Sequence, residues 1–249
     1  MEIEERLVRL FPARSQMAAR YRYRQIRGRL EEEMAWIDRL IPPGRRAIDV
    51  GANKGIYTYL LAKHCEHVEA FEPLPDCAEA IRRCAHPRIT LHEYGLSDQA
   101  GVSTLFLPIH EGRKVDGYAT LHKTDAPHAE INIVLRRLDD FEFSDVSFIK
   151  IDVEGHELAV INGARETILS EKPVMLIEIE QRHHAGPISE VIHTCIQLGY
   201  AGYFVAGKQL QPIESFEPQI HQSSLAANGD LAAYINNFIF IPISDSQRT

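Results

Sequence analysis

The stretch AIDVGANKGIYT, from Ala47 to Thr58, constrains the fold of this chain more than any other. An apolar run ends beside Asp49, a short turn lies between Gly51 and Gly55, and a helical pattern of apolar residues begins at Ile56. The order predicts a strand, a tight glycine turn and a helix. Gly51 allows a sharp turn and a close approach by a ligand, because it has no Cβ. The start of the helix offers unpaired N–H groups and a partial positive charge, which suit a carboxylate or a phosphate.

The spacing of the glycines bears on which ligand this turn holds. The dinucleotide fingerprint has the form G-x-G-x-x-G, whereas Asn53 stands at the middle position here and the spacing is G-x-x-x-G. A nicotinamide-dependent oxidoreductase is therefore the less favoured alternative. Glu72 follows an apolar strand at 68–71 and can accept hydrogen bonds from both hydroxyls of a ribose. Together, Asp49, the turn and Glu72 suit a nucleoside that carries an amino acid, which describes S-adenosylmethionine (SAM).

Predicted strands and helices alternate along the chain after residue 45. This alternation indicates βαβ units and a mainly parallel sheet, which binds its ligands at the carboxyl ends of the strands. A long helix is expected from 155 to about 170, and another from 188 to 198. Seven strands are predicted for the main sheet, at 46–50, 68–71, 89–92, 147–153, 174–179, 200–205 and 237–243. A further short strand is predicted at 131–135, and the weak alternation at 102–107 indicates an extra one.

Several phrases of the sequence match one family in order. They are DVGANKGIYT, FEP, GLSDQAG, LRRLDD and IKIDVEGHE, and they extend over residues 46–243. This set resembles the FkbM-type methyltransferases, a branch of the class I SAM-dependent enzymes. The resemblance implies a Rossmann-like α/β fold with a mainly parallel seven-stranded sheet, an antiparallel last strand beside the fifth, and helices on both faces. It also implies methyl transfer from SAM to a hydroxyl of a sugar, a glycan precursor or another secondary metabolite.

Alternatives to this activity remain open at the level of the sequence. Related enzymes methylate nitrogen or carbon, and a non-catalytic SAM-binding interaction module would keep the same turn. The resemblance places adenine contacts at Ser97 and Asp98, although an aspartate at such a place is also common as a turn cap. The residues predicted to contact the cofactor are Asp49, Gly51, Asn53, Gly55, Glu72, Ser97, Asp98 and Asp152.

The phrase IKIDVEGHE is the second candidate centre. Lys150 and Asp152 are two apart on a predicted strand and therefore share a face. Asp152, Glu154 and His156 then surround a strand-to-helix turn at the ligand edge. Two carboxylates there are costly unless they meet a cation, donors or solvent. They could orient the acceptor, remove its proton or bind a metal; alternatively, they only fix the turn and cap the helix.

A pair of histidines follows the strand at 174–179. Histidine titrates near neutral pH, so His183 or His184 is a candidate base, although an exposed loop often contains such residues. The predicted catalytic residues are Asp152, Glu154, His156 and His183. A divalent ion could in principle bind to Asp152, Glu154, Glu178 and His183, but the spacing is not specific, so no metal is predicted.

The stretch 108–130 is the least regular part of the chain, and a loop of this length is often functional. The resemblance places an acceptor loop at 117–121, where Tyr118 is larger than the residue expected there. The loop is therefore expected to help to select the acceptor.

Residues 1–44 are predicted to form an arginine-rich helical arm, and residues 45–249 the SAM-dependent domain. The arm is interpreted as a solvated charged segment, as a cover for the substrate cleft, or as a segment that binds anionic lipid or glycan. It could also mediate a homo-oligomer or another surface contact. The formal net charge of −8 argues against a general nucleic-acid binder.

Features that would indicate export or membrane insertion are absent from the sequence. The four cysteines form no C-x-x-C pair, the start MEIEERLVRL has no signal-peptide layout, and no apolar run reaches membrane-spanning length. A cytoplasmic enzyme with a small-molecule or glycan acceptor is expected.

Overall fold

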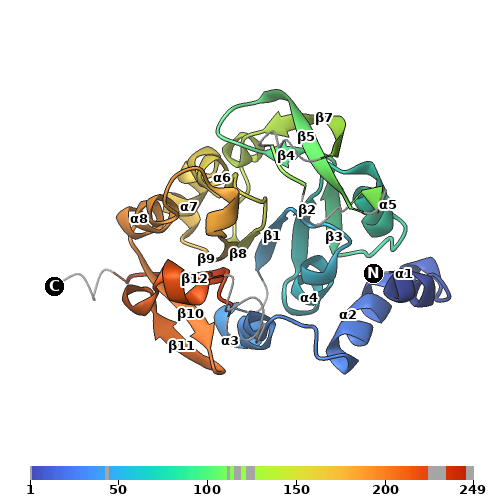
Figure 1. Cartoon of the computed structure of the whole chain (residues 1–249), viewed down its shortest axis with the longest axis horizontal. Helices are drawn as coiled ribbons and strands as arrows, with labels where there is room; N and C mark the ends of the chain where they lie inside the picture. The colour runs from blue at the N-terminus through green and yellow to red at the C-terminus, as the bar shows by residue number, and fades with distance from the viewer. Residues whose placement is uncertain are drawn as a thin grey trace.

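A computed structural model describes residues 2–42, 45–110, 113–114, 119–121, 127–223 and 234–244. Its centre is an eight-stranded sheet with helices on both faces, in the order β11-β10-β12-β9-β8-β1-β2-β3 (Figure 1). The strands are β1 (Arg46–Val50), β2 (His67–Phe71), β3 (Ile89–His92), β8 (Val146–Ile151), β9 (Val174–Glu178), β10 (Tyr200–Ala206), β11 (Gln209–Pro212) and β12 (Asn237–Pro242). The seven predicted strands are thus confirmed, and β11 adds an eighth at one edge.

Strands β12 and β11 run opposite to the other strands of the sheet. Strands β1, β2, β3, β8 and β9 pair in parallel, whereas β12 is antiparallel to both β9 and β10. The expected insertion of the last strand beside the fifth is confirmed. Its register pairs Asn237 with Glu178, so that both side chains lie at the edge where the parallel strands end.

A second, smaller sheet lies beyond the ends of β1 and β2. It consists of β4 (Gly95–Leu96), β5 (Gly101–His110), β6 (Arg113–Lys114) and β7 (His128–Arg136), in the order β4-β7-β5-β6. The prediction of an irregular stretch at 108–130 was therefore partly wrong, because β5, β6 and β7 extend into it. Gly117 and Tyr118 of the predicted acceptor loop lie outside the described residues.

Helices cover the two faces of the large sheet and form two cores. Strand β8 is buried throughout: Ile149 and Ile151 pack with α6 (Glu157–Gly163), α7 (Arg165–Glu171) and α8 (Ser189–Gln197), while Phe148 packs with α4 (Ile56–His64). Alternate residues of a strand point to opposite faces, so β8 contributes to both cores. The single helix predicted at 155–170 is divided in two at Ala164. Helix α5 (Pro75–Arg82) packs beside β3, and α9 (Pro218–His221) follows β11.

The N-terminal arm packs on the domain. It comprises α1 (Glu2–Val8), 3-10 turns at Ala13–Ser15 and Glu32–Trp36, α2 (Gln16–Ile26) and α3 (Ile37–Leu40). Met34, Ile37 and Ile41 are buried in the core with Leu61, and α2 contacts α4 and α5. The arm is therefore not merely a solvated charged segment. The predicted boundary at residues 44 and 45 stays a prediction, since Pro43 and Gly44 are outside the described residues.

Of the helices in the described part of the chain, none combines the length and the hydrophobicity that crossing a bilayer requires.

Candidate active site

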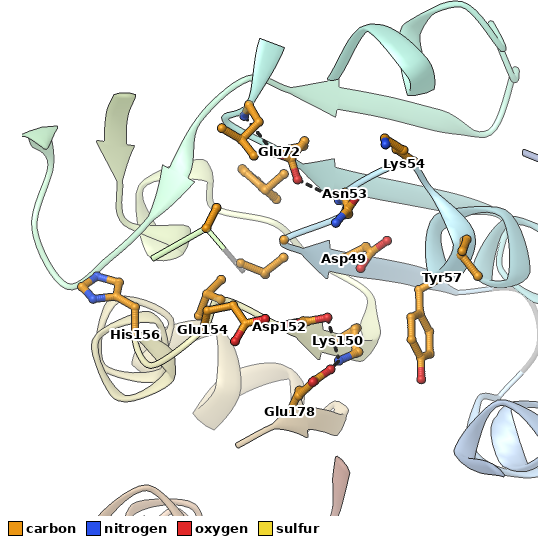
Figure 2. A pocket seen from close by; sticks show the side chains of 18 of the residues that line it. Asp49, Asn53, Lys54, Tyr57, Glu72, Lys150, Asp152, Glu154, His156 and Glu178 are labelled. Atoms are coloured by element: carbon orange, nitrogen blue, oxygen red, sulfur yellow. Dashed lines mark hydrogen bonds and ion pairs between the residues drawn. The ribbon is translucent and has the colours of Figure 1, made fainter. Parts of the chain in front are cut away.

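A cavity of about 860 Å³ lies at the carboxyl ends of β1, β2, β8 and β9. Its size suits a ligand as large as a nucleoside with an attached amino acid. Figure 2 shows side chains of the glycine turn at one end and a cluster of carboxylates around Lys150 at the other. Seven of the predicted site residues line it: Asp49, Gly51, Asn53, Glu72, Asp152, Glu154 and His156.

The glycine turn has the form that the sequence predicted. Gly51 has a φ of +79°, and a Cβ on it would lie 1.8 Å from the backbone oxygen of Asp152. A larger residue would therefore force the end of β1 away from the end of β8. Asn53 adopts a φ of +47°, and Gly55, with a φ of +78°, precedes the first residue of α4.

Glu72 is held in one orientation by two backbone donors. Its Oε2 accepts a hydrogen bond from the N–H of Asn53, and its Oε1 accepts one from the N–H of Leu74, each at 2.7 Å. The carboxylate is 4% exposed and faces the cavity. A carboxylate is an acceptor-only group whose oxygens can each take more than one hydrogen bond, so Glu72 suits the hydroxyl donors of a ligand.

Asp49 lies at the floor of the cavity and is almost fully buried. The Thr58 hydroxyl donates a 2.5 Å hydrogen bond to its Oδ2. Burial raises the pKa of Asp49 to about 6, against the lowering effect of that hydrogen bond and of Lys150. The side chain is therefore suited to meet a cationic group of a ligand, which would replace the lost hydration.

Lys150 is 1% exposed and lies among carboxylates. Its Nζ is 3.7 Å from Asp152 and 3.9 Å from Glu178, and it lies 5.0 Å from the centre of the Tyr57 ring. Burial acts to lower the pKa of Lys150, but these carboxylates, Asp152 first, raise it overall. Burial, with Asp152 nearby, raises the pKa of Glu178 well above its usual range.

The arm contributes a further carboxylate to this cluster. The Tyr57 hydroxyl donates a 2.5 Å hydrogen bond to Glu31, and the Asn237 amide donates another at 3.2 Å to the same oxygen. Glu31 lines the cavity. Sequence reasoning missed Glu31, Tyr57 and Asn237, because no local motif connects three residues so far apart in the chain.

Glu154 and His183 form an ion pair beside the cavity. The His183 Nε2 is 2.7 Å from Glu154 Oε2, and a Cβ on Gly155 would lie 2.5 Å from the His183 carbonyl oxygen. Burial raises the pKa of Glu154, an effect that the ion pair with His183 partly offsets. Burial lowers the pKa of His183, but the ion pair with Glu154 reverses this, and the net shift of the His183 pKa is upward.

Glu180 completes the one grouping within the described residues that has metal-ligand geometry. One atom each from Glu154, Glu180 and His183 lies within 4.8 Å of the others. However, Glu180 already accepts a 2.8 Å hydrogen bond from Tyr234 and pairs with Arg182 at 2.6 Å. The Glu154 charge is paired with His183 and the Glu180 charge with Arg182, so these carboxylates already have cationic partners in the protein.

The remaining predicted residues lie apart from the centre of the cavity. His156 is hydrogen-bonded to Ser97 through its Nε2 at 2.9 Å, and the Ser97 hydroxyl donates to Asp98 at 3.1 Å. Of these three, only His156 lines the cavity, and Asp98 is exposed. Gly55 faces Met17 of the arm rather than the cavity. The adenine contacts predicted for Ser97 and Asp98 stay predictions.

The sheet order, the reversed β12 and the glycine turn define a Rossmann-like fold of the class I methyltransferase type. The sequence matches the family described as the Methyltransferase FkbM domain over residues 49–205. Because the match extends over more than half of the chain, this protein belongs to the FkbM methyltransferase family. The members of this family are SAM-dependent methyltransferases, with SAM as the cofactor.

Solved structures resemble the chain in fold at low sequence identity. The methyltransferase FkbM of Methylobacillus flagellatus is 19% identical with a TM-score of 0.50, and the match covers 93% of this chain and 59% of that one. This chain therefore spans less than two thirds of that relative. An rRNA methylase of Streptococcus thermophilus is 10% identical, with a TM-score of 0.47 and coverage of 85% and 95%.

A Streptococcus mutans protein in complex with S-adenosylhomocysteine (SAH) is 8% identical, with a TM-score of 0.45 and coverage of 85% and 96%. Among curated proteins, none is significantly similar to this sequence.

Proposed function

We propose that this enzyme transfers a methyl group from SAM to a hydroxyl oxygen of a sugar, a glycan precursor or another secondary metabolite. The observation that supports an oxygen acceptor best is the Glu154–His183 pair at the cavity. An alcohol is a poor nucleophile while it keeps its proton, so a positioned base accelerates the transfer. Glu154 lines the cavity, and its raised pKa makes it a stronger base than an exposed carboxylate.

The cofactor would extend from Glu72 across the glycine turn to Asp49. Glu72 would accept the ribose hydroxyls, since its two oxygens are already oriented by backbone donors. Gly51 and Asn53 would contact the amino-acid part, and Asp49 and Asp152 would meet its positive amino group. Ser97 and Asp98 are proposed to contribute on the adenine side, and Gly55 to shape the start of α4.

The reaction is a single displacement. SAM would supply an activated methyl group, which the acceptor oxygen would take as the carbon–sulfur bond breaks and neutral SAH leaves. The acceptor proton passes to Glu154, whose carboxylate His183 orients. His156 and Asp152 would help to position the acceptor in line with the methyl group, because alignment supplies much of the rate.

A panel of acceptors tests this proposal. Sugars, sugar nucleotides and phenols would be compared with amino sugars and other amines in the presence of SAM, and SAH formation would be measured. We expect turnover with hydroxylated acceptors and an O-methyl signal in the product by NMR. Methylation confined to nitrogen or carbon would contradict the proposal. SAH binding without turnover on any acceptor would favour a non-catalytic SAM-binding module.

The base is tested by Glu154→Gln, with Glu166→Gln, an exposed residue of α7, as the matched control. Loss of the base should lower kcat by about 10²-fold or more, while SAH affinity stays close to that of the wild type. Equal activity of both variants would remove Glu154 from the mechanism.

We also propose that the enzyme works in the cytoplasm. Cys65, Cys77, Cys84 and Cys195 are all buried free thiols, which suits a reducing compartment.

A further inference from the structure

Exposed apolar side chains are concentrated on the hairpin formed by α1 and α2. Ten large hydrophobic side chains are exposed in the described part of the chain, and five of them belong to residues 3–26. They are Ile3 (68% exposed), Leu7 (42%), Leu10 (79%), Phe11 (52%) and Ile26 (81%). A cluster of this kind on a small element usually marks an interaction site.

These side chains border an apolar groove on the hairpin. Its volume is about 530 Å³, and the residues that form its wall include Leu7, Phe11, Ala18, Ala19, Tyr23 and Ile26. The opposite side of α2 faces the domain, where Met17 and Arg20 are each 2% exposed. The hairpin is therefore held by its inner side, and no other element among the described residues covers its outer apolar side.

Unpaired arginines accompany the apolar side chains. Six exposed arginines belong to the hairpin and the residues next to it, and none of them forms an ion pair with a carboxylate in the described part of the chain. They are Arg6, Arg9, Arg14, Arg22, Arg27 and Arg29. In contrast, Glu4 and Glu5 turn inward to Arg24 and Arg20.

The hairpin consequently has a charge opposite to that of the whole protein. Residues 2–29 contain eight arginines and three glutamates, a formal charge of +5, although the complete chain carries −8. The outer face thus combines apolar side chains with positive charge. A surface that complements it must offer both an apolar region and negative charges.

We propose that the outer face of the α1–α2 hairpin docks on a lipid bilayer that carries anionic headgroups. Helices that lie in a membrane interface have this composition: the apolar side chains enter the boundary of the acyl chains, and the arginines pair with phosphates. Leu10 and Phe11 would insert, and Arg6 and Arg9 would contact headgroups. Since Glu5 and Arg24 of the same hairpin line the active-site cavity, docking would bring the cavity next to the bilayer.

Sedimentation of the full-length protein with vesicles tests this inference. Vesicles of phosphatidylcholine alone would be compared with vesicles that also contain phosphatidylglycerol, at low and at high salt. We expect binding to the anionic vesicles that weakens with salt, because exposed charges are screened. Leu10→Glu with Phe11→Glu, and separately Arg6→Glu with Arg9→Glu, should each reduce the partition coefficient by about tenfold or more.

Matched controls separate the hairpin from general charge and hydrophobicity. Val102→Glu with Ile220→Glu changes two apolar side chains of similar exposure elsewhere, and Arg83→Glu with Arg165→Glu makes the same change of charge outside the hairpin. Both control pairs should bind vesicles as the wild type does. Thermal unfolding of every variant confirms that it is folded.

Three results would overturn the proposal. The first is that the wild type does not bind anionic vesicles at low salt. The second is that the hairpin variants and the control variants lose vesicle binding equally. The third is that the protein does not bind vesicles but forms a dimer in light scattering, and that Leu10→Glu with Phe11→Glu dissociates this dimer. The last result would assign the face to a second copy of the chain.

Discussion

The backbone N–H of Asn53 donates a 2.7 Å hydrogen bond to the carboxylate of Glu72 and thereby joins the glycine turn after β1 to the end of β2. A second bond, from the N–H of Leu74, fixes the other oxygen. The carboxylate is thus positioned before any ligand arrives, so that little entropy is lost when a ribose binds.

Glu72→Gln should weaken SAH binding by about tenfold or more, since a hydrogen bond to a charged group contributes roughly 1.5–3 kcal/mol. The amide would also present a donor where the site needs an acceptor. Calorimetric titration measures the change, and Glu79→Gln on the exposed side of α5 serves as the control. Unchanged affinity in Glu72→Gln would exclude the residue from the cofactor site.

Gly51→Ala should abolish SAH binding or prevent folding. Its Cβ would lie 1.8 Å from the Asp152 carbonyl oxygen, and the φ of +79° disfavours any other residue. Gly207→Ala is the matched control, because Gly207 has a φ of +58° and no atom near its Cβ position. Circular dichroism and calorimetry on both variants separate steric clash from backbone strain. Normal SAH binding by Gly51→Ala would contradict the close approach of β1 and β8.

Asp49→Asn should stabilise the ligand-free protein at pH 7.5 while weakening SAM binding. The pKa of Asp49 rises from an ordinary value near 3.8 to about 6 in the folded state. Its contribution to stability is therefore fully present below pH 3.8 and is lost as the pH rises to about 6. A rise of about two pKa units corresponds to about 3 kcal/mol of lost unfolding free energy. The variant should therefore be more stable than the wild type by about this amount at pH 7.5.

Urea unfolding of Asp49→Asn and the wild type at pH 4.5 and pH 7.5 measures this difference. We expect the advantage of the variant to shrink at the lower pH. A variant that is less stable than the wild type at both values would show that the Asp49 charge is not costly in the free enzyme.

Arg20→Ala should weaken SAM binding although Arg20 belongs to the arm. Its guanidinium donates to the Lys54 carbonyl oxygen at 3.0 Å and pairs with Glu5 at 3.1 Å. Loss of these bonds should cost about 1–3 kcal/mol of stability and loosen the glycine turn. Arg27→Ala, an exposed arginine of the same arm, is the control.

Measuring KM for SAM, kcat and the melting temperature separately distinguishes the two ways in which Arg20 could act. A higher KM for SAM with a nearly unchanged kcat in Arg20→Ala indicates that the arm positions the turn. A lower melting temperature with unchanged KM would instead mean that the arginine only stabilises the fold.

Local sequence patterns predicted the parts of the site that lie within one turn or one strand. The order of β1, glycine turn and α4 could be read from Ala47 to Thr58, because each step depends on residues next to one another. The same holds for Glu72 at the end of β2. The Glu154–His183 pair was foreseen only as two separate candidates, since contact between neighbouring strand ends needs the sheet order.

Contacts over long distances in the chain could not be predicted. Tyr57 meets Glu31 and Arg20 meets Lys54 through the packing of the arm, for which the sequence offers no spacing rule. The division of the predicted helix at Ala164 has a similar cause. Gly163, the last residue of α6, packs against the Ser97 carbonyl oxygen, which lies 2.0 Å from where a Cβ would be.

The most direct test of the account is a crystal structure of the protein with SAH bound. The account predicts that the ribose hydroxyls lie within hydrogen-bond distance of the Glu72 carboxylate, with the sulfur directed towards Asp152 and Glu154. A ribose placed away from Glu72, or SAH bound outside the cavity at the carboxyl ends of β1 and β8, would contradict it.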